Sequence, residues 1–358
     1  MQQWKNKQPN FKGQQFFVGI DVHSKNWAVT IRTNNNHLKT LSMNPSPEAL
    51  HQYMTKHYPN GEFNSVYEAG FCGFWIHRSL TNLGFNNVVI NPADVPTTHK
   101  EKHRRCDTVD SAKLSRELAD GALKAIYTPD PFHEQLRSLT RLYCKSVKHR
   151  TRIKNRIRGF LNQYGVKIPA RSELFPWSGR FLQWLSTIEF EYEPANAYLK
   201  FCFEELIQTR QRTKDIIHQL RVYSKESPIK EIVHDYLMSI PGIGFITAII
   251  FYSEIIDMKR FHKFDHLASF VGLVPDVDAS GDRETIKGLT FRRNRYLRHM
   301  IVEAAWIAIG KDPALTLQFQ ELTKRMTKQK AIVRIAKKLL SRMRYVWMNE
   351  IPYVLSVV

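Results

Sequence analysis

The chain has 358 residues, 43% of them hydrophobic, and its 53 lysines and arginines outnumber its 33 aspartates and glutamates to give a net charge of +20. This length predicts two or three domains with hydrophobic cores, and the charge indicates a polyanionic partner, most simply nucleic acid; the alternative is a basic but soluble enzyme. Four scattered cysteines without a CxxC pair, a polar stretch at residues 1–14 and the lack of an apolar run of about 18 residues exclude a zinc site, a disulfide framework, a signal peptide and a membrane span, so we expect a cytoplasmic protein.

Residues 15–130 alternate between strand-like and helix-like runs, which predicts an α/β sandwich. The first run is apolar and leads straight into Asp21, so it reads as a strand buried on both faces. The expected order is strand Phe16–Ile20, strand Trp27–Ile31, helix Pro47–His57, strand Ser65–Ala69, helix Phe74–Leu83, strand Asn87–Ile90 and a helix from Asp107 to about Ala119.

Four carboxylates stand at informative places in this region. Asp21 follows a buried strand, Glu68 ends another strand, and Asp107 and Asp110 are three residues apart, so they share one face of a helix. A buried carboxylate is costly unless it is paired or holds a cation, and oxygen ligands suit Mg²⁺ or Mn²⁺. The pattern therefore predicts a metal site for phosphoryl transfer, with two ions about 4 Å apart. Taken singly, Asp107 is also an ordinary helix cap and Glu68 an ordinary strand-end charge.

Beyond Thr128–Pro131 the pattern changes to long helices. Apolar residues spaced three and four apart form two heptad seams, the first from Leu136 to Phe160 and the second from Leu199 to Leu220, each with two polar interruptions. With a loop-rich tip at residues 165–196, they predict an antiparallel coiled-coil hairpin; the alternative is two helices packed on a globular core. The basic residues around the first seam belong to a solvated face or follow a phosphate backbone.

A glycine-rich turn, Pro241–Gly244, separates two short apolar helices, Val233–Ile240 and Phe245–Ile256. Gly242 and Gly244 would leave backbone N–H groups free at the second helix's N-terminus, where the helix dipole also favours a phosphate. This predicts a helix-hairpin-helix-like motif that binds DNA, and the alternative is a plain interhelical turn.

A polar loop is predicted at residues 276–288, and it contains Ser280 followed by Gly281. A serine in such a loop would act as a nucleophile toward a phosphodiester, although loops contain many serines without such a role. Cations that would stabilise developing phosphate charge follow it: Arg283, Lys287, Arg292, Arg293, Arg295 and Arg298.

Taken together and in order, these motifs closely resemble the IS110 family of transposases, including the IS1111 group and the related Piv-type DNA invertases. The resemblance covers about residues 16–345. It rests on the segments Gly19–Lys25, Tyr67–Ala69, Cys106–Leu114, Ser239–Gly244, Phe270–Pro275 and Ala279–Gly281.

The resemblance implies a domain order. A polar tail at residues 1–14 would precede a RuvC-like (RNase H-like) DEDD domain at 15–130, a coiled-coil hairpin at 131–230 and a mostly α-helical transposase domain at 231–358. The family's acidic positions fall on Asp21, Glu68, Asp107 and Asp110, and its catalytic serine falls on Ser280. Arg293 stands where the family usually has glycine, whereas Leu297 and Arg298 match.

The resulting hypothesis is a metal-dependent serine recombinase. Ser280 would attack the scissile phosphate, and the covalent link would conserve the phosphodiester's free energy, which fits the absence of a GxxxxGK[ST] loop. The resemblance implies donor and target double-stranded DNA, a structured noncoding guide RNA and bacterial cytoplasm near the nucleoid; we also expect a homo-oligomer, a dimer or tetramer, with no membrane partner. The rival functions are a RuvC-like nuclease or junction resolvase using water, and a non-catalytic nucleic-acid-binding protein.

Overall fold

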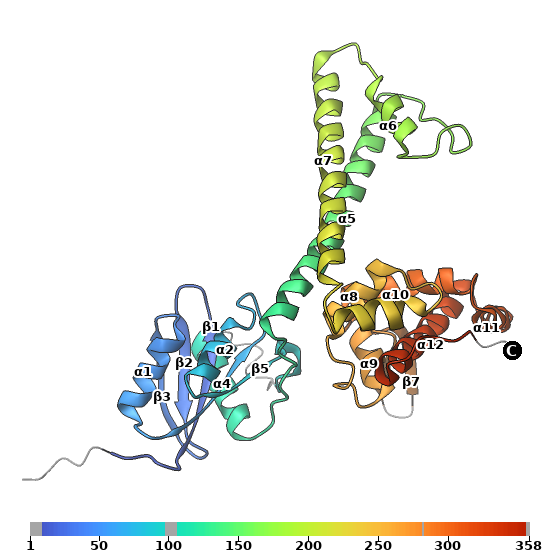
Figure 1. Cartoon of the computed structure of the whole chain (residues 1–358). Coiled ribbons are helices and arrows are strands. Elements are labelled where there is room, and N and C mark those ends of the chain that lie inside the picture. The colour runs from blue at the N-terminus through green and yellow to red at the C-terminus, as the bar shows by residue number, and fades with distance from the viewer. Residues whose placement is uncertain (1–8, 97–105, 281–282, 356–358) are drawn as a thin grey trace, which may run out of the picture. The chain divides into compact units, whose positions relative to one another are not determined.

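The computed structural model describes residues 9–96, 106–280 and 283–355, excluding the side chains of residues 277–287. The chain divides into two compact units, Met1–Pro129 and Asp130–Val358 (Figure 1). Among the described residues, no helix is both long enough and apolar enough to span a membrane.

The N-terminal unit is built on one mixed sheet, which confirms the predicted α/β class. The described strands are β1 (Gln15–Val22), β2 (Trp27–Arg32), β3 (His37–Met43), β4 (Glu62–Glu68) and β5 (Asn86–Ile90). They lie in the order β3-β2-β1-β4-β5, with β2 antiparallel to β1 and β3, and with β4 parallel to both β1 and β5. β3 has no counterpart among the predicted strands, because most of its residues are polar and at least partly exposed.

Successive side chains of β1 point to opposite faces of the sheet, and each face packs against a different layer of helices. On one face, side chains from β1 join the core formed with α1 (Pro47–His57) and α2 (Trp75–Asn82). On the other face, the strand contacts α4 (Asp107–Ala119). The face toward α1 and α2 includes Phe16, Val18 and Ile20.

A glycine allows α4 to cross β1 closely. A Cβ placed on Gly19 would lie 2.1 Å from the Ser111 carbonyl oxygen and 2.5 Å from the Ser115 nitrogen. The Ser111 hydroxyl also lies 2.9 Å from the Thr30 hydroxyl, a buried hydrogen bond that ties α4 to β2. The small side chains of α4 and the missing side chain on β1 therefore fix the helix directly over the strand.

Replacing Gly19 with alanine is expected to lower the unfolding free energy by about 3 kcal/mol, because the helix backbone must move away from β1. Calorimetry of the full chain measures this change. Gly70→Ala is the matched control, since a Cβ at exposed Gly70 meets no atom nearer than 3.8 Å. Equal stability of the two variants would contradict the argument.

The C-terminal unit begins with two long helices, α5 (Pro131–Gln163) and α7 (Glu193–Tyr223), which pack against each other in antiparallel directions (Figure 1). At one polar position of each predicted seam, the buried hydroxyls of Ser146 and Thr213 lie 2.8 Å apart. The connection that we expected to be rich in loops contains a helix, α6 (Gly179–Ser186). Ser178 caps this helix, whose Phe181 and Leu185 are buried, and Leu185 packs in a core with residues of both long helices.

The core of the C-terminal unit is centred on α8 (Phe245–Ile255), in which every residue from Thr247 to Ile255 is buried and which packs against α5 among other helices. A short π-helix (Glu231–Tyr236) and a 3₁₀ helix (Leu237–Ser239) replace the regular helix predicted before the glycine turn. The other described helices are α9 (Phe264–Val271), α10 (Arg295–Ala308), α11 (Pro313–Thr323) and α12 (Lys328–Asn349).

The prediction of a polar loop at residues 276–288 was wrong. The segment forms an antiparallel hairpin of β6 (Pro275–Ser280) and β7 (Arg283–Leu289). Its residues are mostly polar, so no apolar alternation marked the strands in the sequence, and pairing between the two strands supplies the order that the pattern did not indicate.

Candidate active site

Asp21 and Glu68 stand near the carboxyl ends of two neighbouring strands. Gly19 of β1 is paired with Val66 of β4 in a parallel register, and both residues face α4. Because side chains alternate along a strand, Asp21 and Glu68, each two residues further along, point to that same face. The sheet thus places two carboxylates from distant parts of the sequence side by side.

The first turn of α4 brings Asp107 and Asp110 to this place. His23 connects the helix to the strand: its Nε2 atom lies 3.3 Å from Asp21 Oδ2 and 3.5 Å from Asp107 Oδ1. Asp21, His23 and Asp107 each have one potential ligand atom here, and these three atoms all lie within 4.8 Å of one another. The predicted carboxylate positions therefore converge, with an imidazole among them.

The four carboxylates influence one another electrostatically. Burial raises the pKa of Asp21, and the charges of Asp107 and Asp110 raise it further, while His23 opposes the change. Burial likewise raises the pKa of Glu68; Lys113 opposes this, and the charges of Asp110 and Asp21 add to it. Burial is thus the main reason that both pKa values are raised, and the neighbouring carboxylates add to it.

These residues fit a hard divalent cation. Carboxylate oxygens are the ligands that Mg²⁺ and Mn²⁺ prefer, and a cation would stabilise the charged form of Asp21, which burial and the neighbouring carboxylates disfavour. The Asp107 side chain is 53% exposed and that of Asp21 is 25% exposed, so a substrate phosphate can reach the group.

His23 and Lys113 lie among these carboxylates, and neither was predicted from the sequence as a site residue. The signal for His23 was its two-residue spacing from Asp21, which keeps both on one side of an extended chain. Lys113 is three residues beyond Asp110 on α4, and it is buried although it is a lysine. A buried lysine near carboxylates reduces the repulsion among them and helps hold them together.

Ser280 is the last residue of β6, and it is paired with Arg283 across the hairpin. Lys287 belongs to β7. The side chains of both Ser280 and Lys287 lie outside the described part of the structure, so their predicted roles stay predictions.

The two glycines of the predicted DNA-binding motif differ in their surroundings. Gly242 has a φ of +90°, and a Cβ there would lie 2.6 Å from the Ala304 carbonyl oxygen of α10. Packing against α10 therefore accounts for Gly242. Gly244 is exposed and precedes α8, whose N-terminus has no side-chain cap. Nucleic-acid contact by either glycine stays a prediction.

Of the four arginines predicted after the hairpin, three line one cleft and Arg292 does not. Arg295 and Arg298, on α10, line this cleft together with Arg293. Arg293, which stands where glycine was expected, approaches Gly272: a Cβ on Gly272 would lie 2.3 Å from the Arg293 Cβ. Glycine at 272 thus accommodates the larger residue at 293.

Comparisons with known proteins agree with the geometry. The profile described as "Transposase IS116/IS110/IS902 family" matches residues 234–320, and a DEDD transposase profile of the IS110 group matches residues 18–166. The chain is 25% identical to the provisionally named transposase y4qE of Sinorhizobium fredii, over 81% of this chain and 71% of that relative. It is 24% identical to the transposase for insertion sequence element IS1111A of Coxiella burnetii, over 75% of this chain and 73% of that protein.

Proposed function

Because this chain belongs to the IS116/IS110/IS902 family of transposases, enzymes that cut and rejoin DNA, we propose that it does so through a covalent phosphoserine intermediate and with a divalent cation. The observation that carries the proposal is the convergence of Asp21, His23 and Asp107, with Asp110 and Glu68 in electrostatic contact.

In this proposal the four carboxylates would hold divalent cations beside the reacting phosphate. Mg²⁺ or Mn²⁺ held by Asp21, Glu68, Asp107 and Asp110 would supply positive charge to the phosphate oxygens as the bond breaks. His23 orients the Asp21 carboxylate through its hydrogen bond, and Lys113 lowers the repulsion felt by Glu68. Each residue thus prepares a negatively charged site to accept cations and a phosphodiester.

Ser280 is the proposed nucleophile. Its hydroxyl oxygen forms a bond to phosphorus and its proton passes to solvent. The bond from phosphorus to one deoxyribose oxygen breaks, and that oxygen takes up a proton from solvent to leave as a DNA hydroxyl. In the second step a DNA hydroxyl attacks the phosphoserine, which re-forms a phosphodiester and frees the serine. The number of ester bonds is unchanged, so no nucleotide hydrolysis is needed.

The finer organisation is also proposed. The sheet order supports a RuvC-like domain at residues 15–130, and the antiparallel α5 and α7 support a coiled-coil domain at 131–230. Residues 231–358 would form the transposase domain, with Pro241–Gly244 as a helix-hairpin-helix-like motif. A noncoding guide RNA would select donor and target DNA by base pairing, and a homo-oligomer would hold the two DNA molecules together.

A covalent-trapping assay tests the serine mechanism. The full chain, purified with its accompanying RNA, is mixed with Mg²⁺ and labelled DNA that spans the element's ends and target. We expect label to remain on the protein through SDS, and both Ser280→Ala and Asp110→Ala to abolish it. Ser269→Ala, at an exposed serine of α9, is the control that should retain the adduct. If the DNA were cleaved without forming an adduct, and if Ser280→Ala still cleaved it, the nucleophile would be water and not serine.

A further inference from the structure

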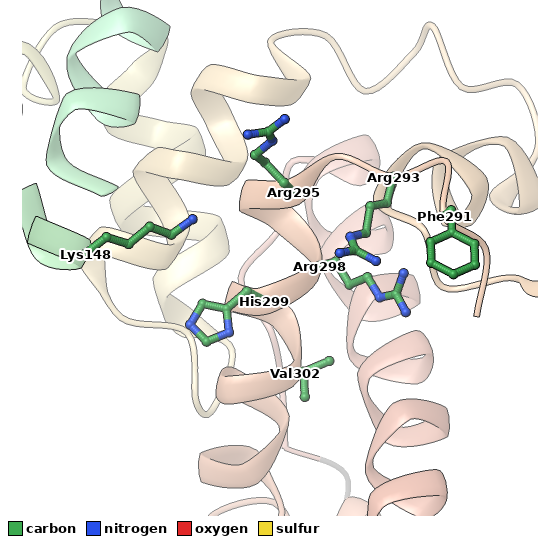
Figure 2. A pocket seen from close by; sticks show the side chains of 7 residues that line it. All are labelled: Lys148, Phe291, Arg293, Arg295, Arg298, His299 and Val302. Atoms are coloured by element: carbon green, nitrogen blue, oxygen red, sulfur yellow. The ribbon is translucent and has the colours of Figure 1, made fainter. Parts of the chain in front are cut away.

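A basic cleft of about 690 Å³ lies in the C-terminal unit (Figure 2). Its lining side chains come from α5, from the turn after β7 and from the first turns of α10. They include Lys148, Phe291, Arg293, Arg295, Arg298 and His299. Three parts of the chain thus direct cations to one place.

The cations of this cleft have no acidic partner among the described residues. Elsewhere in the unit, Arg141 is paired with Glu254 and Arg342 with Asp312. No described carboxylate lies within 4 Å of the charged groups of Arg293, Arg295 or Arg298. Burial, together with the charge of Arg293, lowers the pKa of Arg298, so the two guanidinium groups repel each other. Guanidinium groups bind phosphate oxygens through paired N–H donors, and a phosphate would remove this repulsion.

An aromatic ring at the cleft distinguishes it from a simple anion site. The Phe291 side chain is 86% exposed, although a phenyl ring gains stability when it is removed from water. Nucleobases stack on such rings without regard to sequence. Inside a duplex both faces of a base are already covered by its neighbours, so a stacked partner for Phe291 must be an unpaired nucleotide.

The cleft is joined to the base of the hairpin formed by β7 and by β6, the strand that ends at Ser280. Arg298 Nη1 donates a 2.8 Å hydrogen bond to the Thr290 carbonyl oxygen, and the Thr290 nitrogen donates a 3.0 Å hydrogen bond to the Val274 carbonyl oxygen. These bonds attach the basic cleft to both strands at the base of the hairpin. A nucleic-acid strand held in the cleft therefore lies near the base of the hairpin, and β6 runs from that base to Ser280.

We propose that this cleft binds single-stranded DNA, with backbone phosphates on Arg293, Arg295 and Arg298 and one unpaired base stacked on Phe291. The proposal rests on the proposed function, because the strand to be cut at Ser280 is the DNA that the cleft would hold. It assigns Phe291 as a positioning residue that keeps one nucleotide of the bound strand out of the double helix.

Binding of a 12-nucleotide DNA strand that contains 2-aminopurine tests the cleft, using the full chain in EDTA at several salt concentrations. Phe291→Ala should weaken binding about tenfold, abolish quenching of the 2-aminopurine fluorescence and leave the salt dependence unchanged. Arg295→Ala should reduce the slope of log K against log salt by about 0.7 and retain the quenching. Phe291→Trp should keep both affinity and quenching.

Tyr345→Ala is the matched control, since Tyr345 is 60% exposed on α12 and does not line the cleft. It should bind DNA as the unchanged protein does. Wild-type affinity and quenching in Phe291→Ala would overturn the proposal. Tighter binding of a blunt DNA duplex of the same sequence than of the single strand would also overturn it, as would tighter binding of RNA of that sequence. None of these outcomes affects the serine mechanism, because EDTA prevents metal-dependent cleavage and the trapped adduct is measured separately.

Discussion

Replacing Asp21 with asparagine is expected to lower the rate of DNA cleavage about 10³-fold. Asparagine keeps the size of the side chain but removes the charge at the centre of the group formed with His23 and Asp107. Single-turnover cleavage of DNA that spans the element's ends measures the rate. Asp120→Asn, at an exposed carboxylate at the other end of α4, should cleave normally.

Thermal unfolding in Mn²⁺ gives a readout of the same site that does not depend on catalysis. Burial raises the pKa of Asp21 and of Glu68, so both carboxyls hold protons in the folded state at a pH where the unfolded chain has lost them. Without metal, their contribution to stability is complete below the ordinary carboxyl range of about pH 4 and declines as the pH rises through the raised values.

A cation binds the deprotonated form, so the rise in Tm caused by Mn²⁺ should grow over that same pH range. Asp21→Asn should abolish most of the rise, and Asp120→Asn should preserve it. If Asp21→Asn cleaved DNA at the normal rate and kept the full rise in Tm, these carboxylates would not form the metal site.

Replacing Glu254 with alanine is expected to destabilise the C-terminal unit by about 3 kcal/mol, or roughly 5–10 °C in Tm. The Glu254 side chain is 2% exposed, and it accepts hydrogen bonds from Arg141 at 2.7 and 2.9 Å and from Asn294 at 2.8 Å. Its removal leaves a guanidinium and an amide without their buried acceptor. The expected loss is at the lower end of the range for buried ion pairs, because Arg141 is partly exposed and regains water.

The same variant should weaken binding of single-stranded DNA. Asn294 caps α10 by accepting hydrogen bonds from the nitrogens of Tyr296 and Leu297, and Glu254 holds Asn294 in place. Arg295 and Arg298 follow on this helix. Glu204→Ala, at an exposed glutamate of α7, is the control that should change neither Tm nor binding. Unchanged stability of Glu254→Ala would show that this network is not what fixes α10.

The positions of Asp21, Glu68, Asp107 and Asp110 were predictable because each follows a local rule. Apolar runs marked the strands that end at the first two, and the three-residue spacing of the others placed them on one helical face. The hairpin at Ser280 was not predictable in this way, since its strands are polar and pair with each other. The pairing of two strands depends on both segments at once, so hydrophobic periodicity along either segment does not predict it.

The sequence by itself determined the α/β class of the N-terminal unit, the two long helices and the residues of the carboxylate group, because hydrophobic periodicity and helix spacing act over a few residues. Tertiary structure alone decided that Gly19 lets α4 lie against β1, that His23 joins Asp21 to Asp107, and that Lys148 faces the same cleft as Arg298. These contacts join residues far apart in the chain, and close packing selects them only after the elements have formed.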